Sequence, residues 1–106
     1  MKRIQRLSSA DFRKIRPGRR YNGAHFILTI SPHASGGTRF ACVVSKKIAT
    51  RATVRNLIKR RCRAAYRAAD APSVSCALVF SAKRTAAGAA YKDIAADIAE
   101  LVARIR

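Results

Sequence analysis

The chain has 106 residues, with 23 lysines and arginines against five aspartates and glutamates, which gives a formal net charge of +18. This length holds a single domain, and because 49% of the residues are hydrophobic the domain can bury a core despite its charge. Such a charge indicates a polyanionic partner, either nucleic acid or an anionic membrane surface, and argues against an enzyme for neutral substrates.

The first predicted elements are a short helix and a strand. Ser8 or Ser9 can cap the helix, which stops before Pro17 because the residue preceding a proline is pushed out of helical geometry. Residues 21–30 alternate in polarity as a strand does, with room for an extra short strand near residues 19–23. The strand residues predicted to face the core are Phe26, Leu28 and Ile30.

A second strand is predicted over residues 38–45, after turn-forming residues at positions 31–37. Because such a turn reverses the chain, we expect this strand to pair antiparallel with the first one as a hairpin. Its continuous apolar character indicates a central position in the sheet.

A helix is predicted over residues 53–69, and at about 100° per residue its apolar and polar positions separate into two faces. The apolar face comprises Val54, Leu57, Ile58, Cys62, Ala65 and Ala69. The other face is cationic and comprises Arg55, Asn56, Lys59, Arg60, Arg63 and Arg67. Arg61 falls near the apolar face, so we expect it to snorkel outward or to reach something outside the domain.

Pro72 ends this helical region, and another buried strand is predicted over residues 74–81. A last amphipathic helix follows, with Glu100 and Arg104 as an i,i+4 pair and with its acids on a solvated face. The apolar positions of this helix are Tyr91, Ile94, Ile98, Leu101, Val102 and Ile105, and its acids are Asp93, Asp97 and Glu100. The order helix, strand, strand, helix, strand, helix predicts one α+β domain over residues 1–106, a sandwich built on a split βαβ unit.

Most of the charge lies in residues 1–69, which carry a net +17, against +1 for residues 70–106. Sixteen of the 23 basic residues are arginine, whose planar fork of donors matches phosphate and stacks on bases. This bias favours nucleic acid over lipid. Since no apolar run is long enough to span a membrane and no signal peptide is recognised, we expect a cytoplasmic protein without a membrane partner.

Residue types that catalyse hydrolysis or bind metals are scarce. Asp11 is the single acid among residues 1–69, and His25 and His33 have no acidic neighbour in sequence. The three cysteines lie 20 and 14 residues apart, which matches neither a zinc site nor a disulfide framework, so they are interpreted as buried free thiols. We predict no catalytic residue and no metal site in the protein.

The cationic face of the 53–69 helix carries the strongest functional signal. Like charges lie four residues apart at Arg55, Lys59 and Arg63, and no acid lies between residues 39 and 67, so this face repels itself in water. A merely solvated helix face would normally interleave glutamate with lysine and arginine. We therefore expect an anionic partner to relieve the repulsion.

Residues 43–67, VVSKKIATRATVRNLIKRRCRAAYR, resemble the signature of the protein subunit of bacterial ribonuclease P. In that family a strand ends in S-K-K, and after a spacer R-N-x-x-K-R-x-x-R opens a helix that closes on an aromatic and a basic residue. The family motif commonly reads R-N-R, and Leu57 stands in place of its second arginine. The positions that match are Arg55, Asn56, Lys59, Arg60 and Arg63.

The resemblance implies the family's α+β sandwich, in which a mostly antiparallel sheet is covered by helices and the βαβ crossover is left-handed (ribosomal protein S5 domain 2-like). It further implies that the protein joins ribonuclease P RNA, with one protein per RNA, and that together they remove the 5′ leader from precursor tRNA. The chemistry is then expected of Mg²⁺ ions held by the RNA.

The charge pattern and the resemblance together indicate two sets of site residues. Those expected to bind RNA are Ser45, Lys46, Lys47, Arg51, Arg55, Asn56, Lys59, Arg60, Arg61, Arg63 and Arg67. Those expected to line a groove for the single-stranded leader are Phe12, Arg16, His25, Ile27 and Thr29. In this groove bases would lie on Phe12 and Ile27 while Lys59 and Arg63 meet phosphates.

Two other functions stay open from the residues alone. A ribosomal-type structural protein could use the same basic helix to hold RNA without any reaction, and a DNA-binding helix is the second alternative. A DNA reader usually has dimeric symmetry or a projecting helix, whereas this helix is tied between two buried strands, which favours RNA.

Overall fold

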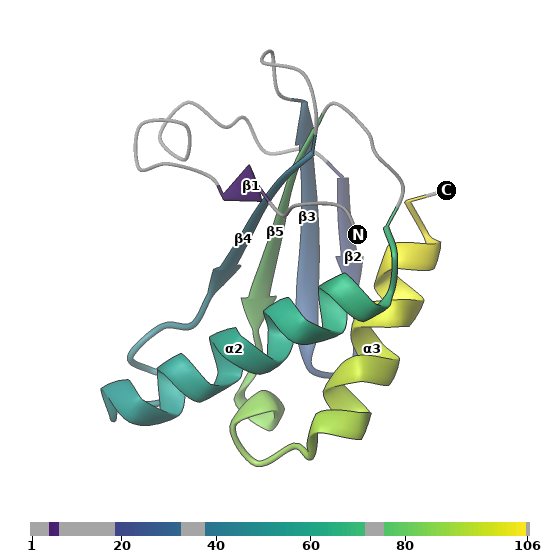
Figure 1. Ribbon diagram of the computed structural model, residues 1–106. Helices are drawn as coiled ribbons and strands as arrows, with labels where there is room; N and C mark the ends of the chain where they lie inside the picture. Colours follow the sequence, from purple (N-terminus) through teal and green to yellow (C-terminus); the bar gives the residue numbers. More distant parts are fainter. Residues whose placement is uncertain (1–4, 7–18, 33–37, 72–75, 106) are drawn as a thin grey trace.

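The computed structural model of the protein (Figure 1) describes residues 5–6, 19–32, 38–71 and 76–105. Its strands are β1 (Gln5–Arg6), β2 (Arg19–Asn22), β3 (Phe26–Pro32), β4 (Arg39–Val43) and β5 (Cys76–Ala82). Its helices are α2 (Ala52–Ala68), the short 3₁₀ helix η1 (Arg84–Ala87) and α3 (Tyr91–Ala103). The predicted N-terminal helix, with Phe12 and Arg16, lies outside the described residues.

The strands form one sheet in the order β1-β4-β5-β3-β2. β2, β3 and β5 pair antiparallel, whereas β5, β4 and β1 pair parallel. The extra strand allowed near residues 19–23 is β2, and a turn separates it from β3. The strand predicted over residues 21–30 is therefore two strands, because Gly23 begins the turn between them.

The predicted hairpin between β3 and β4 is wrong, because β5 lies between these two strands. The first five residues of β5 are buried, whichever face of the sheet they point to. A strand that is apolar on both faces is favoured in a position where both of its edges are paired. β3 and β4 therefore lie on either side of β5, an arrangement that turn-forming residue types do not distinguish from a hairpin.

β4, α2 and β5 form a βαβ unit whose two strands are direct, parallel neighbours, without an intervening strand. In Figure 1 both strands point downward, α2 crosses in front of the sheet, and β5 lies to the right of β4. This is the left-handed sense, opposite to the common one. The crossover expected from the family resemblance is confirmed.

Both long helices pack against the same face of the sheet, which gives the two-layer α+β sandwich that was predicted (Figure 1). The predicted core residues Phe26 and Leu28 are fully buried between the layers, and Ile30 packs against that core. Tyr91 is 41% exposed, so its predicted place on the apolar face of α3 is wrong. It is the first residue of the helix and precedes the turn that begins to pack at Ile94.

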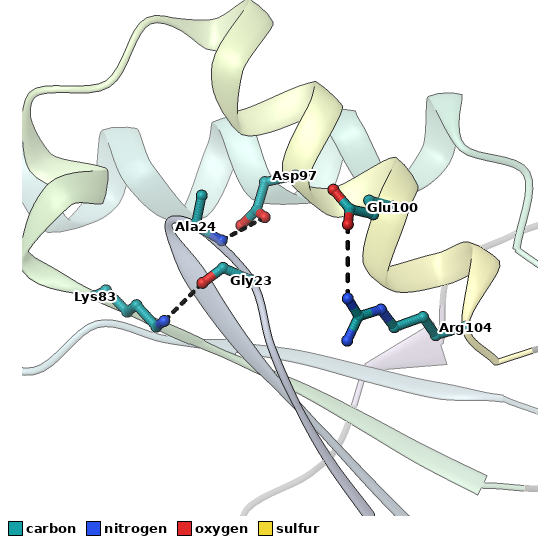
Figure 2. A network of polar contacts seen from close by, with 6 residues as sticks. All are labelled: Gly23, Ala24, Lys83, Asp97, Glu100 and Arg104. Atoms are coloured by element: carbon teal, nitrogen blue, oxygen red, sulfur yellow. Dashed lines mark hydrogen bonds and ion pairs between the residues drawn. The ribbon is translucent and has the colours of Figure 1, made fainter.

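The buried apolar positions of the last helix otherwise follow the prediction. They are Ile94, Ile98, Leu101 and Val102. The expected pair of Glu100 and Arg104 is formed at 3.6 Å between Oε1 and a guanidinium nitrogen (Figure 2).

Candidate nucleic-acid interface

The first turn of α2 is built without the usual capping chemistry. Arg51 occupies the N-cap with extended backbone geometry, makes no side-chain cap bond, and is followed by no acid in the first turn. The preceding loop is held instead by Arg55, whose guanidinium donates to the carbonyl oxygens of Ala49 and Thr50 at 2.9 and 2.8 Å. Free N–H groups and the positive end of the helix dipole therefore lie among basic side chains, which favours an anion there.

Most of the predicted RNA-binding residues are accessible from solvent. Arg55, Arg61 and Arg63 are half-buried. The exposed ones are Ser45, Lys46, Lys47, Arg51, Asn56, Lys59, Arg60 and Arg67. The structure brings this set together along a single loop and the helix that follows it.

Arg61 belongs to the fold rather than to this exposed surface. Its guanidinium donates to the carbonyl oxygen of Ala89, just before α3, at 3.0 Å. The expectation that Arg61 snorkels outward or reaches beyond the domain is therefore wrong. The guanidinium group of Arg61 carries several N–H donors, so it can donate to a backbone carbonyl that precedes α3 although it lies near the apolar face of α2. This hydrogen bond connects α2 to the segment before α3.

The opposite face of α2 is anchored in the core by Tyr66, which is not among the residues predicted for the apolar face. Tyr66 stacks on Phe40 of β4, with ring centroids 4.6 Å apart, and lies 5.9 Å from Phe80 of β5. Burial, together with the nearby Cys76, raises the pKa of Tyr66 to about 12. The aromatic cluster fixes the rotation of α2, so that its cationic face points away from the sheet.

The three cysteines are free, as predicted, with Cys62 and Cys76 buried and Cys42 half-buried. The pKa of the Cys62 thiol is raised, first by a hydrogen bond with the thiol of Cys42 and to a smaller extent by burial. Burial also raises the pKa of Cys76. The thiols of Cys62 and Cys76 are therefore held in the protonated form and pack as small apolar groups.

The face of the sheet that points away from α2 and α3 is called the outer face below. Alternation places Ile27 and Thr29 on it, because their neighbours in β3 point into the core. Two cross-strand rows run over it: Ile27, Ser81 and Val43 in one, and Thr29, Val79 and Ala41 in the next. Val43 of β4, in the row of Ile27, is 36% exposed. Ser31, four residues after Ile27 in β3, is fully buried. The open part of the outer face therefore lies near the β2–β3 turn.

That turn is organised by an acid that was predicted to be solvated. Asp97 of α3 is 5% exposed, and its carboxylate accepts the backbone N–H groups of Ala24, His25 and Phe26 at 2.7, 2.9 and 3.0 Å. The solvated-face prediction is wrong for this residue because Asp97 lies three positions after the buried Ile94 and shares its stripe. Three hydrogen bonds offset the cost of burying the charge.

A lysine completes the same turn. Lys83 donates from Nζ to the carbonyl oxygen of Gly23 at 2.6 Å (Figure 2). In an ordinary two-residue hairpin the N–H of Phe26 would donate to this carbonyl; here Asp97 accepts from the N–H and Lys83 donates to the carbonyl. A Cβ at Gly23 would lie 2.5 Å from a carboxylate oxygen of Asp97, so the position requires glycine.

His25 is held in one orientation by this turn. Its Nδ1 lies 2.9 Å from the hydroxyl of Thr85, and that hydroxyl donates its one proton to the carbonyl oxygen of Ala24 at 3.0 Å. Nδ1 therefore donates to Thr85, and Nε2 is the ring nitrogen left for other contacts.

The two predicted sets of site residues lie on different layers of the molecule. α2 covers the helix side of the sheet, whereas Ile27 and Thr29 belong to the outer face (Figure 1). The first turns of α2 project past the β4 side of the sheet in the same view. Phe12 and Arg16, expected beside Ile27, lie outside the described residues.

Within the described ranges, no three His, Cys, Asp or Glu side chains are grouped so that they could hold a metal ion. The described helices include none that is long and apolar enough to cross a membrane.

Comparisons with solved structures show the same fold. The RNase P protein of Staphylococcus aureus superposes with a TM-score of 0.77 at 23% identity, covering 98% of this chain and 95% of that one. The RNase P protein of Thermotoga maritima gives a TM-score of 0.77 at 18% identity, covering 96% and 98% of the two chains. The α+β class and the arrangement of the elements are thus those of RNase P proteins.

Sequence comparisons point to the same family. The ribonuclease P protein component of Citrifermentans bemidjiense is 34% identical over 82 residues, which cover 77% of this chain and 70% of that protein. The component of Microcystis aeruginosa is 43% identical over 54 residues, and that match spans 45% of its length; the match to the Ralstonia pickettii component spans 36%. The family model for ribonuclease P matches residues 1–106. The chain belongs to the ribonuclease P protein family.

Proposed function

We propose that this chain is the protein subunit of a ribonuclease P holoenzyme, in which one copy joins the catalytic RNA and helps it to remove the 5′ leader from precursor tRNA. Family membership supports the assignment to tRNA processing. The observation that carries the binding role is the exposed cationic surface of α2 and the loop before it.

The helix itself supplies no negative charge to this surface. α2 contains no acidic residue, and its N-cap and first turn also lack one. Arg51, Lys59, Arg60 and Arg67 are exposed. Because these like charges destabilise the free helix, phosphate groups of an RNA partner are their natural counterions.

The outer face supplies a second, different contact. Ile27, Thr29 and Val43 offer apolar and hydroxyl groups at partial exposure. Such a surface suits bases of a single strand, which bind through packing with little sequence preference. In this proposal the leader lies along the outer face, Phe12 adds the stacking platform expected of it, and α2 holds phosphates of RNA.

The chemistry is assigned to the RNA partner. Mg²⁺ held by the RNA would supply the activated nucleophile and neutralise the developing charge. The residues of this chain then bind and orient the precursor. In this proposal the protein, and not the catalytic RNA, contacts the leader. The assembly therefore binds precursor tRNA more tightly than the catalytic RNA does alone.

A matched pair of lysine variants tests the role of α2. Lys59 and Lys92 are both exposed, on α2 and on α3 respectively. The assay uses the holoenzyme reconstituted from the protein and the catalytic RNA. Lys59→Gln should weaken assembly or precursor binding, and the slope of log binding constant against log salt concentration should decrease in magnitude by about one. Lys92→Gln should leave the affinity and this slope unchanged.

Two outcomes would contradict the proposal. Equal losses for the two variants would show that net charge, and not the α2 surface, sets the affinity. Tight binding to ribosomal RNA without any effect on precursor cleavage by the catalytic RNA would favour a structural RNA-binding protein instead.

A further inference from the structure

The outer face extends onto the edge strand β2, to residues outside both predicted site sets. In the antiparallel pair of β2 and β3, Arg20 is directly opposite Thr29 and Asn22 is directly opposite Ile27. Side chains of directly opposed residues point to the same face of a sheet. Arg20 and Asn22 therefore belong to the outer face.

The alternate residues of β2 point the other way. Arg19 is opposite Ile30 and Tyr21 is opposite Leu28. Ile30 and Tyr21 both pack against the core between sheet and helices. Two neighbouring arginines of equal charge thus stand on opposite faces of the same edge strand.

Each row of the outer face consequently begins at a polar group and continues over small apolar and hydroxyl groups. One row reads Arg20, Thr29, Val79 and Ala41, and the next reads Asn22, Ile27, Ser81 and Val43. Arg20 and Asn22 are exposed. The row through Ile27 is the more open one, because Val43 at its end is 36% exposed, whereas Val79 in the row through Thr29 is 8% exposed.

Within the described part of the chain, no acidic group neutralises the charge of Arg20. None of the strands β2, β3, β4 and β5 contains an acidic residue. The guanidinium of Arg20 also has no hydrogen bond or ion pair with any described residue. A planar fork of five donors without a competing carboxylate matches a phosphodiester, which it can bind through two hydrogen bonds.

We infer that Arg20 binds a phosphate of the single-stranded leader at the β2 margin of the outer face, with Asn22 beside a base. This inference rests on the proposed function and adds the side of the sheet on which the leader backbone runs. The partly exposed side chains of Ile27, Thr29 and Val43 meet the bases, and Arg20 holds the backbone at the edge of the sheet. The arrangement binds single strands without reading a particular sequence at Arg20.

The test compares Arg20→Gln with Arg19→Gln, which removes the same charge from the adjacent residue on the other face. Affinity of the reconstituted holoenzyme is measured for precursor tRNA with leaders of increasing length and for leaderless tRNA. Arg20→Gln should reduce the gain from a longer leader several-fold and lower the salt slope of that gain by about 0.7. Arg19→Gln should change neither quantity, and both variants should bind leaderless tRNA like the unmodified protein.

The inference and the proposed function fail in different ways. If the unmodified protein gives no leader-dependent gain, the proposed function itself is wrong. If the gain is present and Arg20→Gln retains it, or if the two variants lose it equally, only the inference is overturned. Thermal melts of both variants check that each remains folded, as expected for two exposed side chains.

Discussion

At the level of single residues, the tip of the β2–β3 turn depends on two opposite charges. Asp97 accepts three consecutive backbone N–H groups, and Lys83 donates to the carbonyl of Gly23. These bonds connect α3 and the end of β5 to the turn that carries His25. A buried carboxylate with several donors is costly to alter, because removing the charge leaves donors without an adequate acceptor.

Asp97→Asn should therefore destabilise the protein by about 2–4 kcal/mol, since the amide retains one acceptor oxygen and directs a donor group at N–H donors. Chemical denaturation at neutral pH measures this change. Asp93→Asn is the matched control, because Asp93 is exposed on the same helix, and it should change the free energy of unfolding by no more than about 0.5 kcal/mol. Similar small effects for both variants would show that the carboxylate is not required.

The raised pKa of Tyr66 predicts that the protein loses stability at alkaline pH. Its pKa is raised from 10.0 to about 12 in the folded protein. Above about pH 10 the unfolded chain releases the phenolic proton while the folded protein keeps it, so the free energy of unfolding falls as pH rises toward 12. The stabilisation is fully present below about pH 10.

Tyr66→Phe should reduce this alkaline decline, because phenylalanine keeps the stacking on Phe40 and has no proton to lose. Unfolding free energies of the two proteins, measured at a series of pH values from neutral to about pH 11, give the comparison. Identical pH profiles would mean that the phenol already reaches water in the folded state.

At the level of elements, the N-terminus of α2 lacks the residue types that usually stabilise the start of a helix. The N-cap position favours Ser, Thr, Asp or Asn, and the first turn favours acids. This helix has Arg51 at the N-cap and no acid in the first turn. Its stability comes from the opposite face, where Ile58, Cys62 and Tyr66 are buried.

Arg51→Asp should raise the free energy of unfolding by about 1 kcal/mol, because a carboxylate at the N-cap accepts a free N–H and interacts favourably with the helix dipole. The same variant should bind RNA more weakly. Arg51→Ala separates the two effects, since it removes the charge without adding a cap: it should also weaken binding but leave stability nearly unchanged. If Arg51→Asp were no more stable than Arg51→Ala, the N-cap assignment would be wrong.

The sequence predicts elements better than it predicts how they pair. The faces of α2 follow from helical period, and the alternation of Phe26 and Leu28 follows from strand period, because each depends on local geometry. Strand order is not local: β5 separates β3 and β4, and nothing in the turn residues shows it. The left-handed crossover likewise came from the family resemblance alone.

The partners of polar residues that lie on the apolar side of a helix could not be predicted either. Asp97 lies at the i+3 position from Ile94, and Arg61 lies near the apolar face of α2. Such positions signal a buried polar contact, yet their partners are a turn and a carbonyl that are distant in sequence. The sequence therefore locates these residues without identifying what they bind. The site expected for Phe12 and Arg16 stays a prediction.

At the level of the whole molecule, the positive charge is distributed unevenly along the chain. Residues 70–106, which supply β5 and α3, are nearly neutral with a net +1, whereas residues 1–69 carry +17. Both parts contribute residues to the core, and the basic part includes α2 and the strand β2. A protein of this kind is expected to bind RNA with a steep salt dependence, because each phosphate contact releases a counterion.

The most direct test of the account is the identity of the RNA that stays with the protein. The chain is isolated from its native cells under conditions that keep complexes intact, washed at moderate salt, and the retained RNA is sequenced. The account predicts that ribonuclease P RNA is the enriched species, with precursor tRNA still carrying its 5′ leader beside it. Enrichment of ribosomal RNA instead, or retention of no RNA, would contradict it.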